Sequence, residues 1–431
     1  MNLLDFSLKV NNYPIKKAKS ELVAIQKLTE NEFVDFVESK KKEIVNYHFK
    51  NNKFYKTLLK NDNLEWDNLP ILEKKDLQIP LKERLSKGFN SKNIFKDKTS
   101  GSTGNPFYFA KDKFTHALTW AIIENRFNWH NLSGKKQARF YGLPKRGIQR
   151  KKELLKDFFS NRIRFDVFDL TENALNKWVI KFRNKNFVYL NGYTSVLVLF
   201  AKYLIKNNLI LKEICPTLTA CVTTSEMLFE SDKKILQKGF GIKVINEYGA
   251  SELDLIAFED VKGNWVLNTE SIFVEIINDH KSVRIGEVGD IVITSLYNKA
   301  NPFIRYKIGD RGAIKKINSK TIILEKLEGR REDVIQLPSG KTAPGLTFYY
   351  ITKSVMEDSG NIKEIKVIQH KIDSFLIEYV ADKKLEPTEE IQIKEALENY
   401  LEPNLCINFK KLDTLKRTKI GKLKQFTSLL K

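Results

Sequence analysis

Thr99-Ser100-Gly101-Ser102-Thr103-Gly104-Asn105-Pro106 is the stretch that gives the first indication of the fold. Its hydroxyl side chains alternate with glycines, which let backbone N–H groups approach an anion. The stretch is therefore suited to holding phosphate, although it lacks the Gly-Lys-Ser/Thr of a Walker A loop. Short strands are expected on both sides, over residues 93–95 and 107–109, and such a turn is also typical of a plain hairpin connection. Other parts of the chain must decide between these two interpretations.

The size and composition are those of a globular protein with more than one domain. At 431 residues the chain is too long for one ordinary core, and 42% hydrophobic with 29% charged residues is typical of soluble proteins. The net charge of +21 comes mostly from scattered lysines. It favours acidic partners such as nucleotides, coenzyme A or an anionic lipid surface, but a lysine- and asparagine-rich composition also explains it. No nucleic-acid-binding signature accompanies the charge, so nucleic acid is not an expected partner.

The cysteines and the apolar segments bear on location. Cys215, Cys221 and Cys406 are odd in number and lack metal or disulfide spacing. The first twenty residues show no signal-peptide pattern, and the most apolar run, residues 196–204, is interrupted by Lys202 and too short to span a bilayer. We therefore expect a reduced, cytoplasmic protein without a transmembrane segment, for which peripheral contact with a membrane stays open.

Strand and helix patterns alternate along much of the chain, which predicts an α/β fold. Helical spacing covers residues 21–47 and 113–129, and apolar strands are expected at 138–143, 187–190, 218–222, 242–245, 265–267, 272–277 and 290–294. Residues 329–333 form an expected boundary, which divides the chain into residues 1–329 and a small α+β unit of residues 330–431. Ligands of α/β sheets bind at the carboxyl ends of the strands, where polar and small residues cluster here.

Two motifs carry side chains suited to a nucleotide. Residues 246–252, Asn-Glu-Tyr-Gly-Ala-Ser-Glu, follow a strand and offer an aromatic ring for a base and a carboxylate for a hard cation. Residues 305–310, Arg-Tyr-Lys-Ile-Gly-Asp, place a carboxylate after a glycine turn, where it can pair with ribose hydroxyls. A helix-capping serine and a β-turn aspartate are the plain alternatives for these two motifs.

Two more motifs lie near the expected small unit. Gly329-Arg330-Arg331-Glu332-Asp333 occurs at the expected domain joint, and Arg417-Thr418-Lys419-Ile420-Gly421-Lys422 occurs close to the end of the chain. A charged linker and a solvated basic tail are their plain alternatives. Each motif is weak by itself, so the order of the motifs along the chain carries the inference.

Taken in order, TSGSTGNP, NEYGASE, RYKIGD, GRRED and TKIGK make the chain resemble the adenylate-forming superfamily of acyl-CoA synthetases, peptide-synthetase adenylation domains and luciferases. The length and the RYKIGD context resemble the phenylacetate-CoA ligase and CapK-like branch, often associated with capsule or surface-polysaccharide synthesis. The resemblance spans residues 99–424 and implies a large multi-sheet N-terminal adenylation (AMP-binding) domain with a small, mobile α+β C-terminal lid domain.

The resemblance also implies roles for individual residues. The β- and γ-phosphates of ATP would be cradled by Ser100, Gly101, Ser102, Thr103 and Gly104. The adenine, ribose and acyl group would be contacted by Thr224, Ser225, Glu226, Tyr248 (stacked on adenine), Gly249, Asp310 (on the ribose hydroxyls) and Arg330. Glu252 would hold Mg²⁺, Glu332 would lie at the hinge, and Lys422 would stabilise charge on the α-phosphate as a catalytic residue.

Some positions depart from the family pattern. Lys419 and Lys424 crowd Lys422, which is favoured because it alone follows Gly421. Asn105 stands where many relatives have lysine, and the segment 258–260 has no cysteine, so no zinc is implied. A basic stretch has two interpretations: it would receive a phosphorylated acceptor such as coenzyme A or a lipid-linked sugar, or it would form a solvated helix face. Its members are Lys145, Arg146, Arg150, Lys151, Lys152, Arg162 and Arg164.

The expected function is an ATP-dependent carboxylic-acid ligase. The acid and MgATP would give an acyl-adenylate and pyrophosphate, and a nucleophile would then take the acyl group and release AMP. Coenzyme A is the default acceptor by resemblance, while an amine of a sugar or amino acid and a protein thiol are alternatives. A catalytically silent nucleotide-binding protein is the alternative from another class. The identity of the acid does not follow from the sequence.

Overall fold

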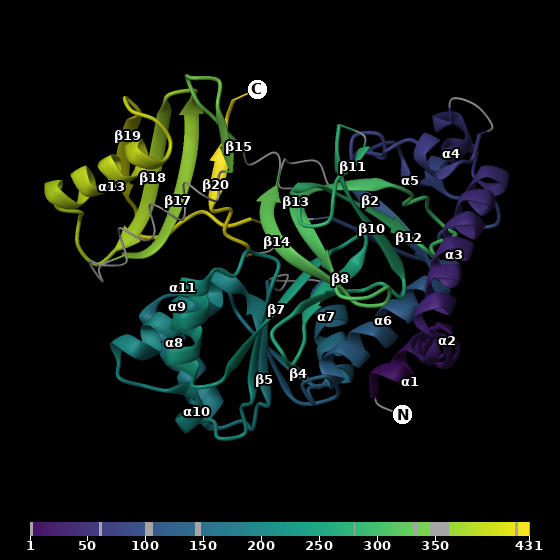
Figure 1. The fold of residues 1–431 in the computed structure, drawn as a ribbon. Helices are drawn as coiled ribbons and strands as arrows, with labels where there is room; N and C mark the ends of the chain where they lie inside the picture. The colour runs from purple at the N-terminus through teal and green to yellow at the C-terminus, as the bar shows by residue number, and fades with distance from the viewer. Residues whose placement is uncertain are drawn as a thin grey trace.

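The computed structural model describes residues 3–59, 63–99, 107–142, 148–279, 281–330, 334–344, 362–418 and 421–430. These residues form a large unit built on a long mixed sheet and a small unit at one side of it, which carries the C-terminus (Figure 1). The small unit lies against the edge of the large unit at which the parallel strands end, so the two units together enclose the site described below.

Helices begin the chain: α1 (Leu3–Val10), α2 (Ile15–Lys27), α3 (Glu30–Asn51), α4 (Lys53–Leu58), a 3-10 turn (Trp66–Asn68) and α5 (Leu81–Arg84). The continuous helical pattern expected over residues 21–47 is divided at Thr29. The Thr29 side chain accepts a hydrogen bond from the Glu32 backbone N–H, and the Glu32 side chain accepts one from the Thr29 backbone N–H. This capping box begins α3 as a separate helix.

The phosphate-loop candidate does connect two strands. β1 (Ile94–Lys98) and β2 (Tyr108–Asp112) pair antiparallel, and the Thr99 N–H donates to the Phe107 carbonyl oxygen at 2.9 Å. Residues 100–106 themselves lie outside the described residues. The expected flanking strands are therefore confirmed, while the phosphate contacts of the loop stay a prediction.

One sheet of twelve strands runs through the large unit in the order β11-β10-β12-β13-β14-β9-β8-β7-β6-β5-β3-β4. The parallel part contains β3 (Gln137–Phe140), β4 (Arg162–Phe165), β5 (Tyr189–Tyr193), β6 (Ala220–Thr224) and β7 (Lys243–Ala250). The antiparallel part contains β8 (Asp254–Glu259), β9 (Trp265–Leu267), β10 (Ile272–Asn278), β11 (Lys281–Ser282), β12 (Gly289–Ser295), β13 (Tyr306–Lys316) and β14 (Ile322–Arg330). The antiparallel direction begins where β8 pairs with β7.

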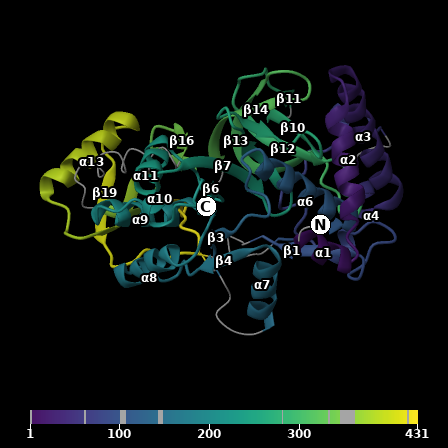
Figure 2. The same cartoon turned by 90° about the horizontal axis from the view of Figure 1, so that it is seen from below.

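Helices cover both faces of the parallel strands, and accordingly every residue of β5 and β6 is buried. One face packs on α8 (Glu172–Arg183), α9 (Thr194–Lys206), α10 (Leu211–Ile214) and α11 (Glu230–Phe240) around a core rich in phenylalanine. The other face packs on α6 (Lys113–Asn128) and α2. The helix α7 (Ile148–Phe159) lies beside the edge strand β4 and also contacts α1 (Figure 2).

The small unit has its own sheet and core. Its strands β17 (Ile362–Lys371), β18 (Ser374–Ala381), β19 (Cys406–Lys411) and β20 (Phe426–Ser428) pair in the order β19-β18-β17-β20, and α13 (Pro387–Tyr400) packs on them. The hairpin of β15 (Val334–Gln336) and β16 (Thr342–Pro344) contributes Ile335 and Leu337 to the same core. The α/β fold class with a small α+β unit is thus confirmed, and the exact division between residues 329 and 330 stays a prediction.

The strand expected at residues 187–190 lies two residues later than its apolar pattern suggests. It runs over Tyr189–Tyr193 because each of these residues pairs with a residue of β6, up to Tyr193 opposite Thr224. Gly192 permits this continuation, since a Cβ at that position would lie 2.4 Å from the Cβ of Phe140 on β3. The strand consequently delivers Tyr193 to the carboxyl edge of the sheet.

Candidate active site

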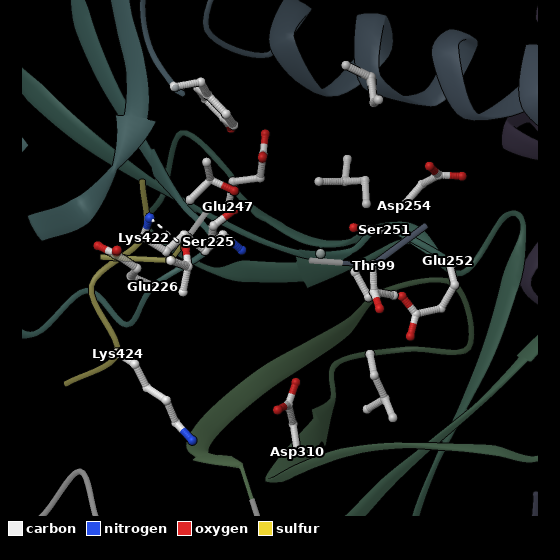
Figure 3. A pocket seen from close by; sticks show the side chains of 18 of the residues that line it. Thr99, Ser225, Glu226, Glu247, Ser251, Glu252, Asp254, Asp310, Lys422 and Lys424 are labelled. Carbon is white, nitrogen blue, oxygen red and sulfur yellow. Dashed lines mark hydrogen bonds between the residues drawn. The ribbon is translucent and has the colours of Figure 1, made fainter. Parts of the chain in front are cut away.

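A cavity of about 500 Å³ lies at the carboxyl ends of β6 and β7, which is where ligands bind in sheets of this type. Its walls come from β3, β6, β7, β13 and the C-terminal segment that precedes β20. Among the sequence-predicted site residues it is lined by Thr224, Ser225, Glu226, Gly249, Glu252, Asp310 and Lys422. Residues separated by more than three hundred positions along the chain, such as Thr99 and Lys422, therefore line one cavity (Figure 3).

The floor of the cavity is a row of side chains set by the register of the parallel strands. Tyr193, Thr224 and Glu247 lie opposite one another on β5, β6 and β7, so they share one face of the sheet. One level deeper on the same face, Arg139 of β3 pairs with Asn191 of β5. Thr224, Glu247 and Arg139 line the cavity, which gives it a polar floor.

Arg139 and Glu247 are opposite charges held near each other without a salt bridge. The guanidinium of Arg139 lies 3.9 Å from the ring centroid of Tyr141 and donates to the side-chain oxygen of Asn191 at 3.4 Å. Its buried Nε atom has no hydrogen-bond partner among the described residues. Burial raises the pKa of Glu247 above that of an ordinary glutamate, while the Thr224 hydroxyl and the charge of Arg139 oppose that rise. Burial also raises the pKa of Tyr141 to about 12.

Glu252 and Asp310 lie on the side of the cavity opposite the C-terminal segment (Figure 3). The Tyr306 hydroxyl donates to Glu252 at 3.0 Å, which fixes one oxygen of that buried carboxylate. Asp310 accepts a hydrogen bond of 2.6 Å from the Tyr248 hydroxyl and lies opposite Arg330 in the β13–β14 register. The two carboxylates are therefore held in place by tyrosines that the sequence motifs themselves supply.

Tyr248 does not line the cavity in this structure. Because alternate residues of a strand face opposite sides, Glu247 points to the cavity and Tyr248 into the core, where its ring centroid lies 5.8 Å from that of Trp265. Its proposed stacking on adenine stays a prediction, and the observed contact is the hydrogen bond to Asp310. Gly249, the next residue, does line the cavity.

The C-terminal segment is fastened to the large unit by Glu226. The carboxylate of Glu226 accepts the backbone N–H of Ser195 at 2.7 Å and the backbone N–H of Leu423 at 3.0 Å. These bonds hold the residue next to Lys422 against the end of β5. The Lys422 Nζ lies 5.8 Å from the ring centroid of Tyr193, and Lys422 and Lys424 both line the cavity. Glu226 also follows Ser225, whose φ of 70° is unusual for a serine and typical of strained backbone at functional sites.

Arg417 makes a second fastening in the same segment. Its guanidinium donates to the Ser195 hydroxyl at 3.1 Å and to the Gly421 carbonyl oxygen at 3.3 Å, and it forms an ion pair with Glu364 of β17. Burial raises the pKa of Glu364, and the charge of Arg417 opposes that rise. Gly421 has φ of 89°, and a Cβ there would lie 2.6 Å from Cγ2 of Val167 in the large unit. The segment therefore fits the large unit closely.

The remaining sequence-predicted site residues cannot be placed. Ser100, Gly101, Ser102, Thr103, Gly104 and Glu332 lie outside the described residues, and the side chain of Arg330 is not described. The cavity is also lined by residues to which the sequence motifs gave no role, among them Arg139, Tyr141, Glu247, Ser251 and Asp254. Glu247 could have been found by applying strand alternation to the motif that contains it, since its neighbour Tyr248 had been given the ligand role.

The basic residues expected near positions 145–164 divide into two groups. Arg162 and Arg164 lie on β4 and form ion pairs with the buried Asp157 of α7, so neither is a solvated cation. Arg150 and Lys151 are exposed on α7, as a solvated helix face requires. Lys145 and Arg146 lie outside the described residues.

A resident metal centre is not indicated. Within the described ranges, no group of three or more His, Cys, Asp or Glu side chains is arranged to hold a metal ion. Mg²⁺ that arrives with a nucleotide needs fewer protein ligands, since it is bound by one or two carboxylates together with the phosphates. Glu252, with one oxygen fixed and the cavity beside it, fits that limited requirement.

No described helix is long and apolar enough to cross a membrane, and the three cysteines are free thiols.

Comparison with known proteins gives a sequence relative and many structural ones. No family model matches the chain. Protein CapK of Staphylococcus aureus is 23% identical over 370 residues, which cover 82% of this chain and 80% of CapK. A crystal structure of 2-hydroxyisobutyryl-CoA ligase in the postadenylation state has a TM-score of 0.71 at 14% identity, covering 93% of this chain and 90% of the ligase. The amide bond synthetase McbA from Marinactinospora thermotolerans has a TM-score of 0.54 at 13% identity, covering 77% of this chain and 68% of McbA.

The same 2-hydroxyisobutyryl-CoA ligase provides a comparison between states. In its thioesterification state, bound to an acyl-adenylate and CoA, the TM-score falls to 0.54 although the coverage of both chains is unchanged. The two units of the present chain are therefore arranged more like those of the postadenylation state. The chain therefore shares its fold with adenylate-forming ligases and is similar in sequence to CapK, in agreement with the resemblance that the order of its motifs implied.

Proposed function

We propose that the protein is an ATP-dependent carboxylic-acid ligase that forms an acyl-adenylate and pyrophosphate in the cavity between its two units. The observation that carries the proposal is the meeting of Glu252, Asp310 and Lys422 around one cavity at the carboxyl edge of the sheet. In this assignment Asp310 holds the ribose and Glu252 holds Mg²⁺, which neutralises phosphate charge when it is bound with ATP. Lys422 neutralises the α-phosphate while the carboxylate attacks, in a site from which water is largely excluded.

The arrangement of the units supports the adenylation step in particular. A carboxylate is a poor nucleophile toward a polyanion, so Lys422 has to be in the cavity while the α-phosphorus is attacked. The bond from Leu423 to Glu226 and the contacts of Arg417 hold the segment there. The second half-reaction then requires these contacts to break, so that an acceptor can approach from the side that the small unit covers.

The polar floor supports a polar acid as the substrate. Glu247 offers acceptor oxygens and Arg139 offers donors, and they do not form a salt bridge with each other. Arg139 contacts Asn191 and Tyr141, and Glu247 has the Thr224 hydroxyl, so a hydrocarbon acid would leave only their remaining hydrogen-bonding capacity unused, which is unfavourable in a desolvated site. An acid whose acyl chain carries hydroxyl or amino groups can give Glu247 a donor and Arg139 an acceptor. We therefore assign the substrate to hydroxylated or amino acids rather than to alkyl or aryl acids.

The acceptor is assigned to coenzyme A by default. An amine of a sugar or of an amino acid, which would agree with a role in surface-polysaccharide synthesis, is the alternative, as is a protein thiol. Each acceptor predicts AMP release from a preformed adenylate only when it is supplied. A catalytically silent nucleotide-binding protein predicts no adenylate with any acid.

Pyrophosphate exchange into ATP tests the proposal directly. The panel of acids should include matched sets that differ in one group, such as propionate, lactate and alanine. We expect exchange with at least one polar acid and, because the hydrocarbon analogue offers Glu247 no donor and Arg139 no acceptor, about a hundredfold preference over that analogue. Absence of exchange with every acid would overturn the ligase assignment, whereas a preference for hydrocarbon acids would overturn only the substrate class.

A further inference from the structure

The helix α7 has its two acidic side chains turned toward the protein and three apolar side chains turned outward. Asp157 is 4% exposed and pairs with Arg162 and Arg164 of β4, and Glu153 pairs with Arg164 at 2.9 Å. In contrast, Leu154, Leu155 and Phe158 are 46%, 58% and 67% exposed. A surface helix of a globular domain normally has the reverse arrangement, with its apolar stripe on the core.

The exposed face of α7 combines apolar and cationic side chains without any acidic one. Leu154, Leu155 and Phe158 follow Lys151 at helical spacing, and Arg150 is exposed beside them. Lys156 is also exposed and pairs with Glu153 at 2.8 Å. The two acidic residues of the helix, Glu153 and Asp157, are taken up by the ion pairs with β4. The helix lies at the periphery of the large unit, apart from the helices that cover the sheet (Figure 2).

We propose that α7 is a docking site for an anionic lipid surface. Leucine and phenylalanine side chains enter the boundary between headgroups and acyl chains, and flanking lysines and arginines are attracted to the negative surface potential. A segment with both features on one face, and its acidic groups neutralised internally, has the chemistry of a helix that lies in the membrane interface. The net charge of +21 adds long-range attraction of the same sign.

The charges on the face favour a lipid surface over a second copy of the chain. A second copy would present the same basic face or another part of a chain whose lysines and arginines exceed its acidic residues by 21. An anionic bilayer meets the three cations with opposite charge and the three apolar side chains with hydrocarbon. The proposal does not depend on the ligase assignment, because α7 contributes no side chain to the walls of the cavity.

Co-sedimentation of the full chain with lipid vesicles tests the proposal. The vesicles contain either equal parts of phosphatidylglycerol and phosphatidylcholine or phosphatidylcholine alone. We expect the wild-type chain to bind the anionic vesicles, and Leu155→Ser/Phe158→Ser to weaken that binding about tenfold or more. The matched control Val261→Ser/Ile285→Ser removes two apolar side chains of similar exposure, 68% and 61%, from elsewhere on the surface and should bind as the wild type does.

Two double charge-reversal variants distinguish binding through α7 from binding through the general basic character of the chain. Lys151→Glu/Lys156→Glu should weaken binding more than Lys238→Glu/Lys262→Glu, which makes the same change in net charge at exposed positions elsewhere. Three results would overturn the proposal: a wild-type chain that stays in the supernatant, equal binding by wild type and Leu155→Ser/Phe158→Ser, or a dimer without vesicles that the serine variant dissociates. Circular dichroism of each variant confirms that the fold is retained.

Discussion

Replacing Arg417 by methionine should uncouple the two half-reactions that we propose for this protein. The guanidinium of Arg417 joins Glu364 of the small unit to Ser195 of the large unit and to the carbonyl of Gly421. Methionine replaces the aliphatic part of the arginine side chain but leaves the Glu364 carboxylate buried without its cation. Removal of one partner from a buried ion pair is unfavourable by about 3–5 kcal/mol.

That penalty applies mainly to the docked arrangement, in which the small unit and the C-terminal segment contact the large unit. Glu364 is on β17, which contacts α9 of the large unit, and Lys202 of α9 donates to the neighbouring Ile362 carbonyl at 3.5 Å. When the units separate, water can reach Glu364, so the unpaired charge is relieved. A loss of about 3 kcal/mol from the docked arrangement corresponds to a decrease of about a hundredfold in its population. Pyrophosphate exchange should fall by about that factor.

The pH dependence of pyrophosphate exchange by Arg417→Met follows from the titration of Glu364. Burial raises the pKa of this carboxyl, and in Arg417→Met the rise is no longer opposed by the arginine. Below the raised pKa the group is neutral and fits its buried position, and the docked arrangement weakens as the pH rises through that pKa. The exchange activity of Arg417→Met, relative to wild type, should therefore recover as the pH falls. Arg417→Met/Glu364→Gln should recover it at neutral pH.

The assay measures the half-reactions separately, with pyrophosphate exchange for adenylation and acyl transfer from a supplied acyl-adenylate for the second step. Arg417→Met should slow the first and leave the second within about threefold, since docking of this arrangement is not needed there. Lys206→Met, which breaks exposed ion pairs with Glu172 and Asp382, is the control and should change neither step. Equal losses in both steps, or unchanged exchange, would refute the reasoning.

Three further predictions concern the cavity. Lys422→Ala should lower pyrophosphate exchange by about a hundred- to a thousandfold. Lys424→Ala should lower it less than about tenfold, because this variant keeps the lysine assigned to the α-phosphate. A larger loss in Lys424→Ala than in Lys422→Ala would move the catalytic role to Lys424. Gly421→Ala places a Cβ against Val167 and strains a φ of 89°, so it should impair exchange while thermal unfolding of the protein changes little. Glu247→Leu should reduce the preference for a hydroxy acid over its hydrocarbon analogue by about tenfold or more in kcat/KM, and an unchanged preference would exclude Glu247 from the acid subsite.

Much of the fold was predictable because its elements are short and strongly patterned. The strand at Trp265–Leu267 has the expected bounds, and those at residues 272–278 and 289–295 differ from expectation by one residue at one end or at both. The strand at Tyr189–Tyr193 was misplaced because Asn191 and Gly192 look like a turn, and only pairing with β6 keeps them extended. Local sequence does not reveal such tertiary pairing.

The site was predictable to the extent that its residues belong to ordered motifs. Glu252, Asp310 and Lys422 do line one cavity, as the resemblance implied. Arg139 could not be found by the same reasoning, because it belongs to no motif. Its position in the cavity depends on the register with Asn191, which is a property of the assembled sheet. Motifs identify the chemistry that a superfamily shares, whereas the register determines the residues that distinguish one substrate from another.

The two fastenings of the C-terminal segment have different consequences for turnover. The Glu226 carboxylate binds a backbone N–H of that segment, so it fixes position whatever side chains surround Lys422. The ion pair of Arg417 with Glu364 lies within the small unit and travels with it, while the bond of Arg417 to Ser195 must break when the units part. Movement of the units therefore exchanges these two hydrogen bonds, the Lys202–Ile362 hydrogen bond and the exposed Lys206–Asp382 ion pair for contacts with water, and it leaves the Arg417–Glu364 ion pair intact. Because such hydrogen bonds contribute only about 1–3 kcal/mol each, the segment can hold Lys422 during adenylation and still release it within a catalytic cycle.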